Sequence, residues 1–196
     1  MTTGSHLMHF IKVAIGIGTV GTQTTYAEQE AIRHFCTGKD KAVEIGVFEG
    51  LNTSIIAKAL KPSGIVFGID PFFTGRLNIS YTKLITKITL SRKKVGQKVT
   101  LIEKISSEAI DDIPDGIDFV FVDGDHSFEG VCDDFFMYSA KLAPSGIIAF
   151  HDARLFENGW TGSDWGPVRL IQEVVIPSKE WKILNETDSL VIISRT

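Results

Sequence analysis

The sequence predicts an α/β protein with a doubly wound, seven-stranded sheet that is mostly parallel, with one antiparallel strand at its edge. Three observations predict this fold class. From residue 42 onward, short β-rich apolar runs alternate with longer helical patterns, which is the rhythm of βα units. The run at residues 119–122 is apolar throughout, as expected for a strand that helices cover on both faces. A short turn, residues 185–189, separates the last two runs, which permits a hairpin.

The predicted elements follow in chain order from these patterns. Strands are expected at residues 42–45, 65–69, 99–102, 119–122, 147–150, 181–184 and 190–194. Helices are expected at residues 53–60, 81–91, 107–110, 130–142 and 167–175. An earlier helix, within residues 24–37, can be capped by Thr24 or Thr25 and is expected to pack outside the sheet.

Length and composition favour one globular domain over residues 1–196, with its core in residues 42–196. The chain has 196 residues, of which 43% are hydrophobic, enough to bury a substantial core. Gly4, Ser5 and His6 fit the remnant of an expression tag. Residues 1–8 are therefore treated as a tag or a disordered end and are left out of the fold prediction.

The charge pattern argues against nucleic acid as a partner. The chain carries 20 basic and 24 acidic side chains, for a net charge of −4, so a small or neutral partner fits better.

The apolar stretch 10–20 is shorter than the ~20 residues that span a bilayer, so no membrane segment is expected. Two cysteines, Cys36 and Cys132, are too few for a disulfide framework. We therefore expect a cytoplasmic protein.

The end of the first strand holds residues suited to an amino-acid zwitterion. Ligands of open α/β sheets bind beyond the carboxyl ends of the strands. Gly46 and Gly50 let the backbone turn tightly there, and the amides that open the next helix face an anionic group. Glu44 can bind an ammonium group. Such residues also occur as plain turn chemistry, so both interpretations stay open.

The second and third strand ends carry weaker signals. Asp70 follows the second strand and can accept hydrogen bonds from two ribose hydroxyls. It also precedes Pro71, and Asp before Pro is a common turn initiator. Ser106 and Ser107 follow the third strand, where they could simply cap a helix.

The fourth and fifth strand ends are more specific. Asp123, Asp125 and His126 come directly after a buried apolar strand, where a solvated turn seldom needs an imidazole. His151 and Asp152 follow the next strand. Because these two strands should be neighbours, Asp123, His151 and Asp152 can converge on one divalent cation.

These motifs resemble the class I S-adenosylmethionine-dependent methyltransferases. Within that class, the chain is similar to small-molecule O-methyltransferases related to catechol O-methyltransferase and to macrolide-sugar methyltransferases. The resemblance covers residues 42–195. Its most specific parts are EIGVFEG at residues 44–50, VDGDHSFEG at 122–130, and FHD at 150–152 followed by GPVR at 166–169. It implies a Rossmann-like fold, S-adenosylmethionine as cofactor and methyl transfer as the activity.

The resemblance also assigns a cofactor pocket. The residues carried over are Glu44, Gly46, Gly50, Asn52, Asp70, Ser106, Ser107 and Asp123. The two glycines would shape the site of the methionine moiety with Glu44 near its amino group, and Asp70 would hold the ribose. Ser106 or Ser107 would line the adenine site. Asn52 stands where the family often has Ser, and its amide would bind the carboxylate instead.

The metal site implied by the resemblance departs from the family pattern. Metal-dependent members place one Asp after strand four and an acidic pair after strand five, but here the pair begins with His151. Either Asp123, His151 and Asp152 form a mixed site for Mg²⁺ or another divalent cation, or the metal has been lost. His126 stands three residues after Asp123, where relatives carry a general base. By analogy with relatives, a homodimer is expected.

The working hypothesis is methyl transfer from the sulfonium to a hydroxyl of a small-molecule acceptor. A metal at Asp123 would position the hydroxyl while His126 removes its proton. Two alternatives stay open. Gly16, Gly18 and Gly21, after a strand at residues 11–15, have the spacing of a dinucleotide fingerprint, which would make the chain an NAD(P)-dependent oxidoreductase. The chain could also be a non-catalytic module that binds the cofactor.

Overall fold

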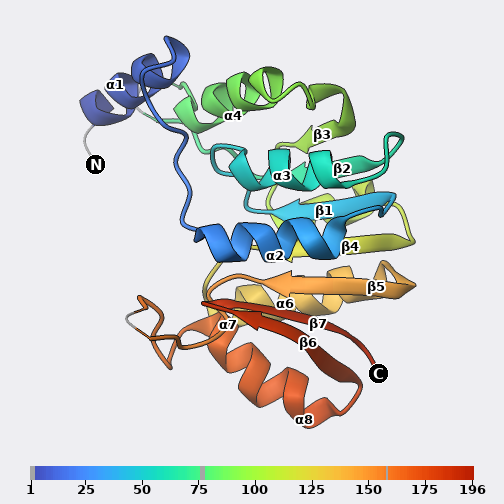
Figure 1. Cartoon of the computed structure of the whole chain (residues 1–196). Coiled ribbons are helices and arrows are strands. Elements are labelled where there is room, and N and C mark those ends of the chain that lie inside the picture. Colours follow the sequence, from blue (N-terminus) through green and yellow to red (C-terminus); the bar gives the residue numbers. More distant parts are fainter. Residues whose placement is uncertain (1–2, 76–77, 158) are drawn as a thin grey trace.

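A seven-stranded sheet is the centre of the computed structural model, which describes residues 3–75, 78–157 and 159–196 (Figure 1). The strands are β1 (Lys41–Ile45), β2 (Ile65–Ile69), β3 (Val99–Ile102), β4 (Ile117–Val122), β5 (Leu142–Phe150), β6 (Trp181–Thr187) and β7 (Leu190–Arg195). Their order in the sheet is β3-β2-β1-β4-β5-β7-β6. The sheet order reverses between β1 and β4, which is where ligands bind in such folds.

The strand directions confirm the predicted fold class. Strands β1 to β5 pair in parallel, and β7 is antiparallel to both β5 and β6. The antiparallel strand therefore lies one place in from the edge strand β6. The hairpin turns at Asp188 and Ser189, inside the predicted turn, because β6 extends three residues beyond its predicted end.

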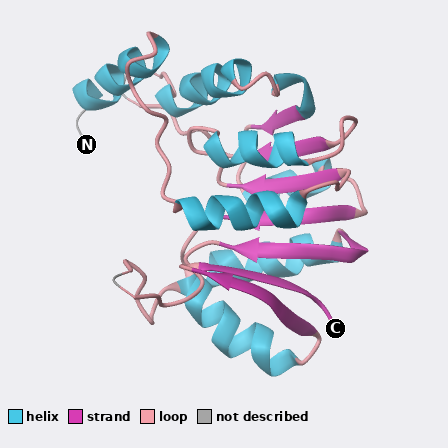
Figure 2. Ribbon diagram, in the orientation of Figure 1, coloured by secondary structure: helices cyan, strands magenta, loops and turns pink. Residues whose placement is uncertain are grey.

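Helices cover both faces of the sheet, as Figure 2 shows. They are α1 (Thr3–Ala14), α2 (Tyr26–Cys36), α3 (Leu51–Ala59), α4 (Tyr81–Arg92), α5 (Ser106–Ala109), α6 (Phe128–Ala140), α7 (Gly166–Arg169) and α8 (Ile176–Ser178). A π-helical stretch, Leu170–Val175, joins α7 to α8. The alternation along β4 explains the two layers. Phe119 and Phe121 pack with α2, α3 and α4, whereas Val120 and Val122 pack with α6 and the π-helical stretch.

Helix α2 begins at the predicted cap and packs on the sheet. The Thr25 side chain accepts a hydrogen bond from the Glu28 amide, and the Glu28 side chain accepts one from the Thr25 amide, which completes a capping box. Ile32 and Cys36 of this helix are fully buried against the sheet. The helix thus fixes Glu28 above the ends of the strands.

The prediction was wrong at the junction of α6 and β5. The helix ends at Ala140, and β5 begins at Leu142 instead of residue 147. Pro144 and Gly146 resemble a turn in the sequence, but the β4–β5 pairing shifts register between Ile117 and Phe119. Such an irregularity lets a strand accommodate proline and glycine.

The N-terminal segment contradicts the dinucleotide interpretation. Residues 11–14 belong to helix α1, not to a strand, and Arg92 of α4 donates hydrogen bonds to the carbonyl oxygens of Val13 and Ala14 at its end. The fingerprint requires a strand before Gly16, so the predicted strand at residues 11–15 is wrong. Residues 3–8, set aside above, lie in α1, while residues 1 and 2 are outside the described residues. Among the described helices, none is long and apolar enough to cross a membrane.

Candidate functional site

A cavity of about 530 Å³ lies at the carboxyl ends of β1, β2 and β4. We call it the main cavity, and it is lined by residues 21–23, 45–48, 51–52, 69–71, 73, 104–106 and 123–126. Residues 21–23 come from the segment between α1 and α2, which runs past this edge of the sheet (Figure 1). The volume is in the range of small-molecule sites. Gly46, Asn52, Asp70, Ser106 and Asp123, predicted from the sequence, all line it.

Gly46 is required where β1 meets β4. Its φ is 89°, a left-handed conformation that favours glycine. A Cβ at this position would overlap the main-chain oxygen of Asp123. Gly46 therefore lets the ends of the two central strands approach each other and brings Asp123 to the cavity wall.

Glu44, Gly50 and Ser107 do not line the main cavity. Glu44 is fully buried, and neither of its carboxylate oxygens completes a hydrogen bond within the described residues, although the Thr53 hydroxyl is nearby. Burial raises the pKa of Glu44 well above its usual range. Alternation along β1 points this side chain toward α3, and its contact with an ammonium group stays a prediction. Gly50 is the cap residue directly before α3 and has a φ of 79°, and Ser107 is exposed.

The main chain holds Asp70 in the cavity wall. Its Oδ2 accepts a hydrogen bond from the amide of Phe48 at 2.9 Å, and its Oδ1 accepts one from the amide of Phe72 at 2.7 Å. Both phenylalanines have positive φ. Two opposed amides fix the carboxylate, and its remaining lone pairs can accept further hydrogen bonds from a ligand.

Asn52 and Ser106 both line the main cavity. The Thr24 hydroxyl donates to Oδ1 of Asn52 at 3.0 Å, so the amide NH₂ group is the donor that Asn52 can offer. Ser106 is the first residue of α5, and its carbonyl oxygen accepts a hydrogen bond from the Tyr138 hydroxyl at 2.8 Å. An amide donor and a hydroxyl thus face the same space.

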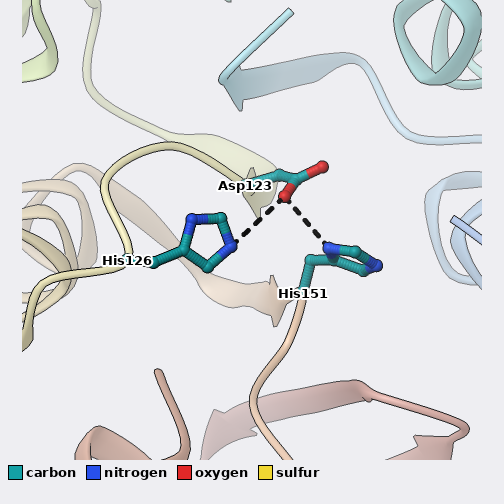
Figure 3. Close-up of side chains that lie close together, drawn as sticks. All are labelled: Asp123, His126 and His151. Atoms are coloured by element: carbon teal, nitrogen blue, oxygen red, sulfur yellow. Dashed lines mark hydrogen bonds and ion pairs between the residues drawn. The ribbon is translucent and has the colours of Figure 1, made fainter. Parts of the chain in front are cut away.

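Four polar side chains converge at the ends of β4 and β5. The carboxylate of Asp123 lies between the rings of His126 and His151 (Figure 3). Its Oδ1 is 3.0 Å from Nδ1 of His151 and 3.9 Å from Nε2 of His126. Oδ2 of Asp152 is 3.0 Å from Nε2 of His126 and 3.5 Å from Nδ1 of His151. The structure therefore brings together the residues that the sequence predicted as neighbours.

His151 is buried between carboxylates on both sides of its ring. Nε2 lies 3.4 Å from Oε2 of Glu28, a residue that is itself fully buried on α2. Oε1 of Glu28 accepts hydrogen bonds from the amide and the hydroxyl of Ser189. Burial alone would lower the pKa of His151, but Asp123 and Glu28 outweigh it and raise this pKa to about 10.

Asp152 holds His126 at the rim of the site. The backbone of Asp152 has a φ of 53°, and its Oδ1 accepts a hydrogen bond from Nε1 of Trp160 at 2.7 Å. The hydrogen bond to Asp152 raises the pKa of His126 above its ordinary value, although burial opposes it. His126 keeps about a third of its side chain exposed, so its ring is open to a ligand.

A second cavity of about 570 Å³ adjoins the first. We call it the side cavity, and it is lined by residues 23, 126–129, 152, 164–166 and 169. Gln23 and His126 line both cavities. The imidazole of His126 therefore stands where two bound molecules could meet.

Sequence reasoning missed Glu28 and Gln23. Glu28 belongs to a Thr-x-x-Glu pattern that signals a helix cap, but that pattern gives no sign of the contact with His151. Gln23 lies in a segment without any periodic pattern. Both are brought to the site by the path of the chain over the sheet.

Comparison with known proteins decides the family. Residues 43–153, more than half of the chain, match the family model described as a methyltransferase domain. The chain belongs to this methyltransferase family. The matched range includes Asp123, His126, His151 and Asp152, so the convergent side chains of this methyltransferase lie within the family domain.

Two relatives found by sequence are uncharacterized proteins. One, from Acanthamoeba polyphaga mimivirus, is 35% identical over 115 residues, which are 56% of this chain and 50% of that protein. The other, from Sinorhizobium fredii, is 39% identical over 61 residues, which are 31% of this chain and 7% of that protein. The methyltransferase thus spans half or less of these relatives.

Solved structures share the fold of the methyltransferase at low identity. An O-methyltransferase from Bacillus cereus in complex with SAH has a TM-score of 0.66 at 15% identity, covering 100% of this chain and 93% of its own. The O-methyltransferase TomG from Streptomyces achromogenes, in complex with SAM, has a TM-score of 0.68 at 13% identity, covering 97% and 89%. An rRNA methylase from Streptococcus thermophilus has a TM-score of 0.61 at 12% identity, covering 89% and 99%. At these identities the likeness shows the shared fold alone.

Proposed function

We propose that this chain transfers a methyl group from S-adenosylmethionine to a hydroxyl oxygen of a small-molecule acceptor. The observation that carries the proposal is the position of His126, which lines both the main cavity and the side cavity. A cofactor in the first and an acceptor in the second would meet at this imidazole. The net charge of −4 supports a small molecule over an RNA acceptor.

The main cavity suits the cofactor part by part. The amide of Asn52 would donate to the carboxylate of the methionine moiety beside Gly46. Asp70, held by two main-chain amides, would accept the ribose hydroxyls. Ser106 would line the adenine end. Glu44 and Ser107 have no direct contact in this proposal, because neither lines the cavity.

His126 is the proposed proton acceptor. Asp152 lies 3.0 Å from Nε2 of His126 and holds the ring in place, as a carboxylate orients an imidazole in other acid–base pairs. The cofactor carries its own leaving group, so alignment of the acceptor oxygen and removal of its proton are what the protein adds. Asp123 lines the main cavity beside the same ring and would help to align the acceptor.

The residues present also fit a divalent cation, Mg²⁺ or another. Oδ1 of Asp123 and Oδ2 of Asp152 lie 3.0 Å and 3.5 Å from Nδ1 of His151. A cation bound there would acidify the acceptor hydroxyl and fix its position.

In solution the protein is proposed to be a cytoplasmic homodimer, by analogy with its relatives.

Two measurements test the proposal. Calorimetry with S-adenosylhomocysteine should show micromolar binding, and radiolabelled S-adenosylmethionine should label at least one acceptor among catechols, phenols and hydroxylated sugars. His126→Asn should reduce kcat at least about 100-fold with unchanged cofactor affinity. His34→Asn, at an exposed position on α2, is the matched control. Absence of cofactor binding would refute the proposal, and binding without any methylation would favour the non-catalytic module.

A further inference from the structure

We propose that the cation site of Asp123, His151 and Asp152 selects a transition-metal ion such as Zn²⁺ or Fe²⁺ over Mg²⁺, and that Glu28 orients His151 as its nitrogen ligand. The inference deepens the cation site in the proposed function. It does not depend on the identity of the acceptor or on methyl transfer, because it concerns only which ion the side chains hold.

Ligand chemistry favours a transition metal. Mg²⁺ binds oxygen ligands in near-ideal octahedral geometry and keeps several waters. Imidazole nitrogen suits Zn²⁺, Fe²⁺, Co²⁺ and Ni²⁺ instead. His151 puts a nitrogen, Nδ1, at the centre of the group, 3.0 Å from Oδ1 of Asp123. A second imidazole, that of His126, is also close: Asp123, His126 and His151 each offer a donor atom within 4.8 Å of the others.

The distances between donor atoms match those around a bound ion. Ligands at ~2.1 Å from a metal are about 3.0 Å apart at right angles and about 3.4 Å apart in a tetrahedron. Nδ1 of His151 is 3.0 Å from Asp123 Oδ1 and 3.5 Å from Asp152 Oδ2. These two distances suit an ion bound beside Nδ1 of His151, for which Oδ2 of Asp152 would exchange its 3.0 Å contact with Nε2 of His126.

Each nitrogen of His151 faces a different carboxylate, although Nε2 completes no hydrogen bond within the described residues. Nδ1 faces the two aspartates, whereas Nε2 lies 3.4 Å from Oε2 of Glu28. A histidine that binds a metal usually gives its other nitrogen to a carboxylate, which fixes the ring and makes it a better donor. Glu28 is well placed for this, since the amide and hydroxyl of Ser189 and the amide of Thr25 hold its carboxylate.

Asp152 is oriented in the same way. Nε1 of Trp160 donates to Oδ1 of Asp152 at 2.7 Å, and the other oxygen, Oδ2, lies 3.0 Å from Nε2 of His126 and 3.5 Å from Nδ1 of His151. The site thus has two ligands that are each held from behind by a further side chain. A buried ion pair between His151 and Asp123 would need neither the Glu28 contact nor the Trp160 hydrogen bond.

Titration of chelator-treated protein with Zn²⁺, Co²⁺ and Mg²⁺ tests the ion preference. We expect one Zn²⁺ per chain, bound at least about 100-fold more tightly than Mg²⁺, and a Co²⁺ absorption spectrum that requires His151. His151→Asp replaces the nitrogen by oxygen and should reduce the Zn²⁺ to Mg²⁺ affinity ratio at least about 10-fold. An unchanged ratio would overturn the proposal, as would Zn²⁺ binding that survives intact in Asp123→Asn.

The role of Glu28 has its own test. Glu28→Gln should weaken Co²⁺ binding about 10- to 100-fold and shift the Co²⁺ spectrum. Glu30→Gln, on the same helix but half-buried and paired with Arg33, should do neither. Equal Co²⁺ affinities and spectra for the two variants would overturn the orienting role. In His151→Asp the added carboxylate would repel Glu28, so His151→Asn serves as a second variant without that charge. His151→Asn should also abolish the Co²⁺ spectrum.

Calorimetry with S-adenosylhomocysteine on the same preparations separates the two proposals. Variants that keep cofactor affinity are folded, so their metal data are interpretable. A protein that binds the cofactor but shows no preference for Zn²⁺ would refute this inference alone. Selective Zn²⁺ binding without any cofactor binding would leave the inference standing and refute the proposed function.

Discussion

The buried carboxyl group of Asp134 makes stability depend on pH in a way that one substitution should remove. Asp134 lies on α6 behind Ser106, is 1% exposed, and neither of its oxygens completes a hydrogen bond within the described residues. Burial raises the pKa of Asp134 from 3.8 to about 6. Between these values the folded protein binds more protons than the unfolded chain, so stability falls as pH rises through this range.

The size of the effect follows from the two pKa values. With 1.36 kcal/mol for each pKa unit, ionisation of Asp134 lowers the free energy of unfolding by about 1 kcal/mol at pH 4.5 and about 3 kcal/mol at pH 7.5. Asp134→Asn cannot ionise. Its stability relative to the wild type should therefore increase by about 2 kcal/mol between pH 4.5 and pH 7.5. Costs that do not depend on pH, such as burial of an amide NH₂ group, cancel in this difference.

Urea denaturation followed by circular dichroism at several pH values measures the effect. Asp133→Asn is the matched control, because Asp133 is the neighbouring residue on α6 and is exposed. Its stability difference from the wild type should stay nearly constant over the same range. If the wild-type and Asp134→Asn curves ran parallel from pH 4.5 to pH 7.5, the argument from burial would be refuted.

Three further substitutions test other parts of the structure. Gly46→Ala should destabilise the protein by several kcal/mol and abolish cofactor binding, since the new Cβ would overlap the backbone of Asp123. Thermal melting measures the loss of stability and calorimetry the loss of binding. A soluble variant with normal cofactor affinity would contradict this prediction. Tyr138→Phe should cost about 1 kcal/mol through loss of the hydrogen bond to Ser106, measured by urea denaturation, and a larger loss would point to altered packing. Asp70→Asn should weaken S-adenosylhomocysteine binding at least about 10-fold and also lower the melting temperature, because its NH₂ group cannot accept one of the two main-chain hydrogen bonds; equal affinity would remove Asp70 from the ribose site.

Much of the site could be predicted from strand order. Asp123 and His151 are 28 positions apart in the sequence, but each directly follows a strand, and parallel neighbours end at the same edge of the sheet. The 3.0 Å contact between them confirms this inference. The strand ends at Asp70 and Ser106 likewise reach the main cavity. They could be predicted from the sequence because short apolar runs and turns are local signals.

Other features needed the folded chain. Glu44 has the right spacing for the cavity, but the alternation of β1 turns it toward α3, and only the register of the folded strand decides that direction. Glu28 contacts His151 from a helix that precedes the sheet, and its sequence signal is no more than a helix cap. The dinucleotide spacing near Gly16 failed for a related reason, since the preceding residues form helix α1.

The sequence by itself determined the alternation of strands and helices, the antiparallel strand near the edge and the polar strand ends, because these depend on patterns within a few neighbouring residues. The tertiary structure alone decided that Glu28 lies behind His151 and that His126 stands between two cavities. Those contacts join segments far apart in the chain, and which segments meet is settled by how α2 and the loops pack over the sheet.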